Sequence, residues 1–129
     1  MNIFFRVDSS YLIGTGHVMR CLTLARKLEK LIGANCNFIC RDLPGALIPL
    51  LEDEGFTVFR LPCGEVTHSD SSSYQSWLTV TLEEDANDTI HCLQSANSEI
   101  CDLVVVDHYG VDFSWEKTIS AYCKKILAI

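Results

Sequence analysis

A glycine-rich turn near the N-terminus carries a histidine, His17, where an apolar run gives way to an amphipathic pattern. The segment "RVDSSYLIGTGHVMRCLTLA" (6–25) contains this turn, with Gly14, Thr15 and Gly16 directly before the histidine. Glycines allow backbone angles that other residues resist, and such a turn leaves N–H groups free toward the ligand side. The histidine is either a helix cap or a general base, and spacing alone does not decide between the two.

Neither of the two common nucleotide loops fits this turn. A dinucleotide-binding turn needs a third glycine where this chain has Met19, and an acidic residue about 20 residues further on at the end of the next strand. A Walker loop needs Gly-Lys followed by Ser or Thr, and this triplet does not follow the turn. The turn is therefore not a nucleotide loop of either kind.

The residues around His17 suit a base that works beside an anion. A helix N-terminus disfavours a charged imidazole, and a neutral ring is what a general base requires near neutral pH. Arg20 lies one turn further along the same helix face, and Arg6 enters the same edge. Their guanidinium groups would hold phosphates or hydroxyls, unless both are ordinary surface charges. Asp8, with the two serines after it, either caps the glycine loop or orients His17.

A second polar cluster, Asp107-His108-Tyr109, follows the apolar run "LVVV". Neighbouring residues of a strand point to opposite faces, so we expect only one of Asp107 and His108 to face a cleft. These residues are too few for a metal site. Cys36 and Cys40 form a single C-x3-C without a second pair, and we interpret them as structural thiols. We therefore expect no metal.

The hydrophobic pattern alternates between strands and helices. Strands are predicted over 2–8, 35–41, 56–61, 101–108 and 125–129. Helices are predicted over 16–33, 45–55, 81–96 and 114–124, the third with a capping box at Thr81 and Glu84. The segment 62–76 is predicted to be a mobile loop. This order indicates an α/β fold with an open, mostly parallel, Rossmann-like sheet and helices on both faces.

Ligands of such sheets bind at the carboxyl ends of the strands. Arg6 and Asp8 end the first predicted strand, and Arg41 ends the second. His108 and Tyr109 follow the fourth. The fold therefore predicts that these polar residues converge on one edge with the glycine turn.

Composition narrows the class of protein. A chain of 129 residues fits one domain, and its 48% apolar and 21% charged residues are ordinary for a folded soluble protein. The net charge of −7 argues against a nucleic-acid partner. No apolar run approaches the ~20 residues of a membrane span, and no signal peptide is evident. Seven cysteines, an odd number, indicate reduced thiols and a cytoplasmic protein.

Two motifs together carry a resemblance to a known family. The pattern "RVDSSxxIGTGHVMRCLTLA", followed by "VVDHYGVD…WE", resembles the UDP-2,4-diacetamido-2,4,6-trideoxy-β-L-altropyranose hydrolases of pseudaminic acid biosynthesis. The segment "WLTVTLEEDANDT" resembles the helix that this family carries between them. The family is distantly related to glycosyltransferases of the B type, which have two Rossmann-like domains. The resemblance covers essentially the whole chain.

The resemblance implies a reaction and a set of site residues. Water attacks the anomeric carbon of a UDP-sugar with inversion and releases UDP, without a metal or another cofactor. His17 matches the catalytic base. Substrate contacts are expected from Arg6, Asp8, Gly14, Thr15, Gly16, Arg20, Arg41, His108 and Tyr109. A hydrolase of this family makes a precursor of surface polysaccharide or of flagellin glycans.

The resemblance also implies a second domain of about the same size, which holds the nucleotide. Nothing in residues 1–129 corresponds to it, so we expect these residues to be the single N-terminal domain of a longer or split protein and nearly inactive alone. Two other functions stay open at this point. One is a glycosyltransferase of the same architecture, and the other is a non-catalytic sugar-binding domain.

Overall fold

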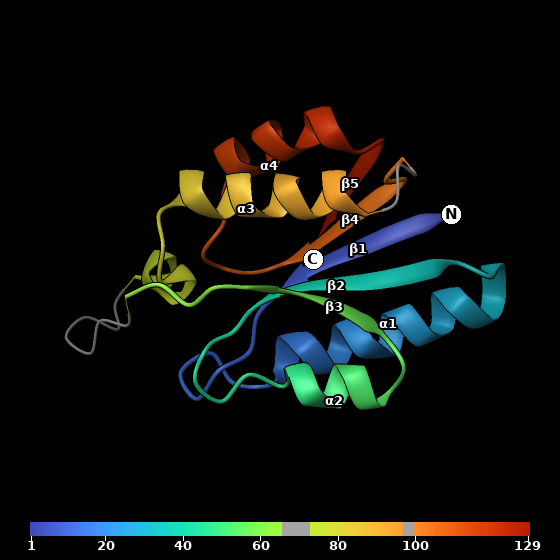
Figure 1. The fold of residues 1–129 in the computed structure, drawn as a ribbon, viewed down its shortest axis with the longest axis horizontal. Helices are drawn as coiled ribbons and strands as arrows, with labels where there is room; N and C mark the ends of the chain where they lie inside the picture. The colour runs from blue at the N-terminus through green and yellow to red at the C-terminus, as the bar shows by residue number, and fades with distance from the viewer. Residues whose placement is uncertain (66–72, 97–99) are drawn as a thin grey trace.

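The computed structural model describes residues 1–65, 73–96 and 100–129 of the chain (Figure 1). Its strands are β1 (Asn2–Val7), β2 (Asn35–Arg41), β3 (Thr57–Leu61), β4 (Leu103–Asp107) and β5 (Lys125–Ala128). Its α-helices are α1 (Gly16–Ile32), α2 (Ile48–Asp53), α3 (Leu82–Ser95) and α4 (Phe113–Ile119). Two 3-10 turns complete the order, η1 (Tyr74–Leu78) and η2 (Ser120–Tyr122).

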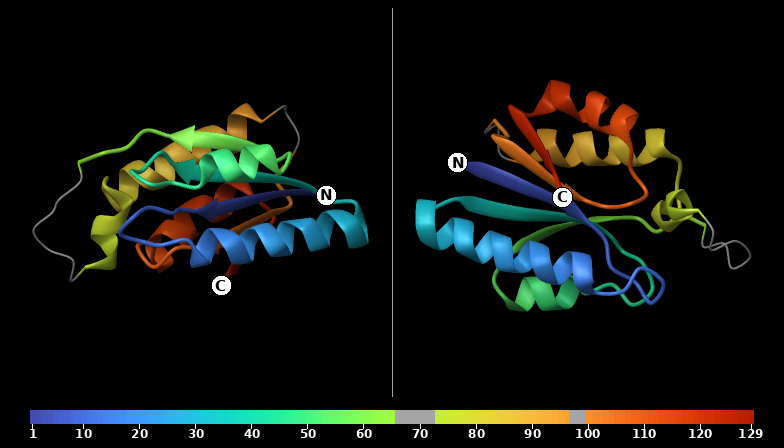
Figure 2. Two further views of the ribbon diagram at one scale, coloured as in Figure 1. Left: turned by 90° about the horizontal axis from the view of Figure 1, so that it is seen from below. Right: turned by 180° about the vertical axis from the view of Figure 1, so that it is seen from behind.

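The five strands form one parallel sheet in the order β3-β2-β1-β4-β5. Helices α1 and α2 cover one face of the sheet, and α3 and α4 cover the other (Figures 1 and 2). The predicted Rossmann-like α/β fold is confirmed. Because all five strands run the same way, their carboxyl ends meet at one edge, which in Figure 1 lies on the side of η1.

The sheet is buried on both faces, which explains why its strands are nearly continuous apolar runs. On the α1 side, Phe5 stacks on Phe38 with ring centroids 5.0 Å apart. On the opposite side, Phe4, Val104 and Trp115 belong to a second core beneath α3 and α4. Strand β1 therefore supplies both cores with alternate residues and is the rigid centre from which the edge residues project.

The helix boundaries follow local signals, with two differences from the prediction. Gly33 ends α1 in a left-handed conformation (φ 64°), and Thr81 caps α3 by accepting a hydrogen bond from the Glu84 N–H, as predicted. The helix predicted over 45–55 is only Ile48–Asp53, because Pro49 fits only in a first turn. The helix predicted over 114–124 is α-helical only to Ile119 and continues as η2.

The predicted end of the loop over 62–76 is wrong, because η1 begins at Tyr74. Its central part, 66–72, lies outside the described residues. None of the helices in the described ranges is both long and apolar enough to cross a membrane.

Candidate active site

His17 and Asp107 meet at the carboxyl edge of the sheet. Strand β4 lies beside β1, with Val7 opposite Asp107, and the turn after β1 returns the start of α1 to the tip of β4. The Nδ1 atom of His17 lies 2.6 Å from Oδ1 of Asp107. Arg20, one helical turn later, donates from Nη2 to the same oxygen at 2.5 Å and from Nε to the other oxygen. His17 and Arg20 therefore share one buried carboxylate.

The contact with Asp107 determines which ring nitrogen of His17 can accept a proton. A carboxylate only accepts hydrogen bonds, so Nδ1 carries the hydrogen and Nε2 is left with its lone pair. Within the described ranges Nε2 makes no hydrogen bond. A base whose second nitrogen is held by a carboxylate is the arrangement that activates water or a hydroxyl in many enzymes. Thr15 occupies the cap position of α1, so His17 is not the helix cap.

Asp107 carries a negative charge beside His17. The side chain of Asp107 is fully buried, and this burial acts to raise its pKa. Hydrogen bonds from Arg20 and His17 outweigh burial and hold the pKa of Asp107 below its ordinary value. The carboxylate is therefore ionised at neutral pH, as an acceptor for both His17 and Arg20 must be.

The thiol of Cys21 lies against the same carboxylate. Burial, together with the nearby Asp107, raises the pKa of its thiol to about 12. The protonated thiol donates to Oδ2 of Asp107 over 3.7 Å. Cys21 therefore acts as a packed thiol, in keeping with the structural role expected for cysteines in this chain.

Asp8 and His108 form a second pair beside the first. Oδ1 of Asp8 accepts from Arg6 Nη1 at 2.6 Å and from the Arg41 backbone N–H at 2.7 Å. Its other oxygen accepts from Arg6 Nη2 at 3.0 Å and from Nε2 of His108 at 2.9 Å. Nδ1 of His108 accepts from the Gly110 N–H at 2.8 Å. Both ring nitrogens of His108 are therefore engaged, and it holds the loop after β4 in place.

Asp107 and His108 line one small gap with Asp8, His17 and Tyr109, and this gap is too narrow for a water molecule. A closed gap is not a cleft, so the expectation that only one of the two faces a cleft stays a prediction. Strand β4 ends at Asp107, so the alternation of a strand does not extend to His108. Of the three residues Asp8, Ser9 and Ser10, Ser10 caps the glycine loop, because its Oγ accepts from the Ile13 N–H at 2.8 Å. The expectation that Asp8 orients His17 is wrong, because Asp107 holds the imidazole.

Arg6 and Arg41 belong to a buried ion cluster behind Asp8. Both side chains are fully buried, and each donates from Nη2 to Oδ1 of Asp85 at 2.6 Å. Trp115 donates from its indole nitrogen to the other Asp85 oxygen at 2.9 Å. Arg6 is therefore not the surface charge considered as its alternative. In this structure neither arginine nor Asp8 has surface through which to touch a substrate.

The glycine turn lies at the rim of the site. Gly14 adopts a left-handed conformation (φ 84°), and its N–H donates to the Ser10 carbonyl at 2.8 Å. Thr15 and Gly16 are exposed where α1 begins. The backbone of the turn therefore borders the same edge as His17, as predicted.

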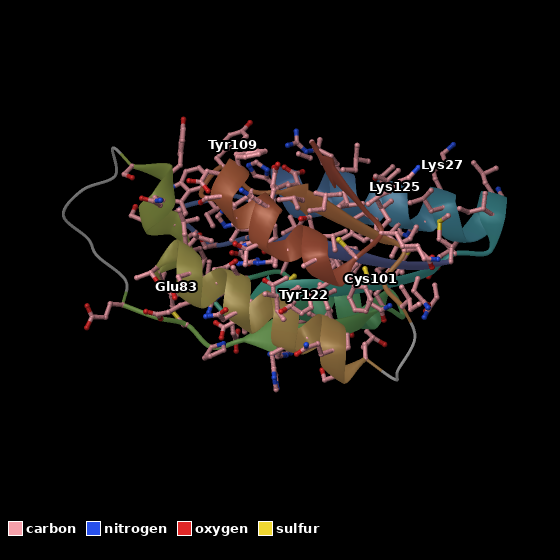
Figure 3. All side chains as sticks on the ribbon, turned by 90° about the horizontal axis from the view of Figure 1, so that it is seen from above. Lys27, Glu83, Cys101, Tyr109, Tyr122 and Lys125 are labelled. Atoms are coloured by element: carbon pink, nitrogen blue, oxygen red, sulfur yellow. The ribbon has the colours of Figure 1, made fainter. Side chains whose placement is uncertain are left out.

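An aromatic cover over His17 was missed from the sequence. The ring of Tyr109 meets His17 edge to face at a centroid distance of 4.8 Å. The rings of Tyr74 and Trp77, both in η1, lie 5.3 Å and 6.2 Å from that of Tyr109 between centroids. In Figure 3, Tyr109 lies at the upper margin of the molecule, apart from Lys27 and Lys125. Tyr74 falls in the segment predicted as a loop (62–76), and no helix or strand was predicted for Trp77, so the sequence gives no sign of these contacts.

The part of the chain that the structure describes contains no cluster of three or more His, Cys, Asp or Glu side chains able to hold a metal. Each of the seven cysteines is free. The carboxyl edge of the sheet presents an oriented imidazole, a half-exposed guanidinium and aromatic rings.

The low pKa values of Asp8, Asp85 and Asp107 predict acid sensitivity. For each, burial acts to raise the pKa, but guanidinium and histidine partners lower it overall. Groups with a lowered folded pKa stabilise the fold above the unfolded value, about 3.9, and this contribution is lost as pH falls below it. We expect the free energy of unfolding in urea to be steady near pH 6 and to fall steeply below about pH 4. Equal free energies of unfolding at about pH 6 and about pH 3 would contradict this expectation.

Comparison with known proteins supports the resemblance. No protein-family model matches the chain. The chain is similar to a curated protein of Campylobacter jejuni subsp. jejuni serotype O:2, UDP-2,4-diacetamido-2,4,6-trideoxy-beta-L-altropyranose hydrolase, with 29% identity over 119 residues. The alignment covers 92% of this chain and 32% of the relative, so the chain spans about a third of that relative's length. A distant homologue is therefore a UDP-sugar hydrolase.

Proposed function

We propose that this chain is the sugar-side domain of a UDP-sugar hydrolase, with His17 as the base that activates water. The observation that carries the proposal is the 2.6 Å contact between Nδ1 of His17 and Asp107, which leaves Nε2 as the basic atom at the ligand edge of the sheet. The similarity to a UDP-sugar hydrolase along nearly the whole chain supports the same reaction class.

The proposed step is an inverting displacement at the anomeric carbon. The water oxygen forms a bond to this carbon while the bond to the UDP oxygen breaks, and UDP leaves with the electron pair. Nε2 of His17 receives the water proton, and the Asp107 carboxylate stabilises the imidazolium that forms. Arg20 holds Asp107 in place, and its half-exposed guanidinium attracts the anionic substrate to this edge.

We further propose that the nucleotide is held by a region outside these 129 residues, since the relative is about three times as long as the aligned part. The buried cluster of Arg6, Arg41 and Asp8 then has a positioning function, because it fixes the ends of β1 and β2 beside the site. The substrate class that the relative's name suggests is a diacetamido-trideoxy hexose joined to UDP. As the resemblance of the two sequence motifs implies, we propose that the reaction belongs to pseudaminic acid biosynthesis in the cytoplasm.

The test is an assay of the complete gene product with the UDP-linked diacetamido-trideoxy sugar and no acceptor. We expect UDP and free sugar to appear in equal amounts. UDP release that requires an added acceptor would identify a glycosyltransferase instead. Binding of the sugar with no turnover would indicate a non-catalytic domain. Either outcome overturns the proposed hydrolase.

A further inference from the structure

Two histidine–aspartate pairs line the same small gap, and they use opposite ring nitrogens. His17 meets Asp107 through Nδ1, and its Nε2 makes no hydrogen bond within the residues that the structure describes. His108 meets Asp8 through Nε2 at 2.9 Å, and its Nδ1 accepts from the Gly110 N–H at 2.8 Å. The first pair therefore has a nitrogen left for a ligand, whereas the second pair is closed onto the backbone.

The tautomer of His108 follows from its two partners. A backbone N–H is always a donor, so Nδ1 of His108 carries no hydrogen, and the ring hydrogen lies on Nε2 and points to the Asp8 carboxylate. Asp8 is buried and is itself held by both Nη atoms of Arg6, at 2.6 Å and 3.0 Å. The buried ion cluster therefore keeps His108 as an acceptor toward the loop after β4.

The bond to Gly110 determines where its neighbour Tyr109 lies. The loop approaches η1 closely, since a Cβ atom on Gly110 would lie 2.7 Å from the Tyr74 carbonyl oxygen and 2.8 Å from the His108 ring. A side chain at this position would displace the loop. The loop that carries Tyr109 is therefore held between His108 and η1.

Tyr109 in turn encloses the proposed base. Its ring meets the His17 ring edge to face, with centroids 4.8 Å apart. Its phenol interacts with Arg20, whose pKa is raised above the ordinary value first by a hydrogen bond to Asp107 and then by this phenol. Arg20 and His17 share Asp107. The four side chains therefore form a closed ring of contacts, in which the imidazole is held by a hydrogen bond and by ring packing together.

We propose that His108 is a positioning residue for the base: by accepting the Gly110 N–H, it holds Tyr109 against His17 and so keeps Nε2 of His17 aimed at the attacking water. His108 is buried with both ring nitrogens engaged, so it acts through Tyr109 rather than on the substrate. The inference rests on the proposed function for the role of His17. It also connects the buried ion cluster with the chemistry, since Asp8 reaches the base through His108.

Two amide substitutions separate the two bonds of His108. The carbonyl oxygen of asparagine stands near the place of Nδ1 and can accept from Gly110, whereas the amide nitrogen of glutamine reaches as far as Nε2 and can donate only to Asp8. We expect His108→Gln to lower kcat for UDP release by roughly 10- to 100-fold, the cost of a misplaced catalytic group, with a smaller change in KM. We expect His108→Asn to keep kcat within about threefold of the wild-type value.

Steady-state kinetics of the complete gene product measure both constants, and His91→Gln, which changes an exposed histidine of α3, is the matched control. A second measurement detects the ring contact without turnover. With labelled histidine and tyrosine in the complete gene product, we expect a nuclear Overhauser effect between the rings of His17 and Tyr109 in the wild type and in His108→Asn. We expect this effect to be lost in His108→Gln.

Thermal unfolding shows whether each variant folds. If His108→Gln does not fold, Gly110→Ala takes its place, because the added Cβ displaces the same loop and leaves the His108 side chain unchanged. A folded His108→Gln protein with wild-type kcat, or an equal loss of kcat in the glutamine and asparagine variants, overturns the proposal. A ring contact that persists in His108→Gln overturns it as well.

The two measurements also separate this proposal from the hydrolase itself. If the ring contact is lost in His108→Gln and kept in His108→Asn, in a protein that releases no UDP, the positioning of Tyr109 is upheld and the hydrolase is refuted. If UDP is released at the same rate with and without His108→Gln, the hydrolase is upheld and the positioning role is refuted.

Discussion

Replacing His17 by glutamine is expected to lower kcat for UDP release by about 10²- to 10⁴-fold, the usual contribution of a positioned general base. Glutamine keeps a polar side chain of similar length but cannot take the proton of the attacking water. Substrate affinity is expected to change little, because Nε2 meets the water rather than the sugar. Steady-state kinetics of the complete gene product measure both quantities.

The matched control for this variant is His91→Gln, which changes an exposed histidine of α3 and is expected to leave kcat unchanged. Because His17 and Asp107 act as one unit, adding Asp107→Asn to the His17 variant is expected to cost little more activity. A His17→Gln protein with wild-type kcat would show that His17 is not the base. A further large loss of kcat in the double variant would show that Asp107 does not act by positioning His17.

Replacing Asp85 by alanine is expected to destabilise the fold by about 3–5 kcal/mol, because it leaves two buried guanidinium groups without their shared carboxylate. The Asp85 side chain is fully buried and bonds Arg6, Arg41 and Trp115 together. Removing it leaves charges that water cannot reach. Urea unfolding followed by circular dichroism measures the loss.

Asp88→Ala provides the comparison on the same helix face. Its carboxylate meets Arg41 at 3.1 Å, but the side chain is 36% exposed, so the expected cost is only about 0–1 kcal/mol. If the free energy of unfolding of the Asp85→Ala variant lies within about 1 kcal/mol of the wild-type value, the fold does not depend on the buried cluster for its stability.

The sheet and the place of the site could be predicted because they depend on local and periodic signals. Apolar runs alternate with amphipathic segments, and the carboxyl ends of parallel strands must meet at one edge. His17 and the residues after "LVVV" therefore converge as expected. That His17 contacts Asp107 rather than Asp8 could not be predicted. Both aspartates end apolar strands, and only the tertiary arrangement of the strand ends decides which of them reaches His17.

The buried cluster around Asp85 and the ring contacts among Tyr74, Trp77 and Tyr109 depend on tertiary packing that no local pattern reveals. Asp85 lies in the first turn of α3, where an acid is explained equally well by the helix dipole. Nothing nearby in the sequence shows that it reaches Arg6, 79 residues away. Likewise, Tyr74 joins Tyr109 only because η1 packs against Gly110, and the segment around Tyr74 has the composition of a loop.

The most direct measurement is a single turnover of the complete gene product in water labelled with heavy oxygen. Attack of water activated by His17 on the anomeric carbon predicts that the label enters the released sugar at that carbon and that UDP carries none. Label found in the terminal phosphate of UDP would show that a phosphorus–oxygen bond breaks instead, and would contradict the proposed reaction.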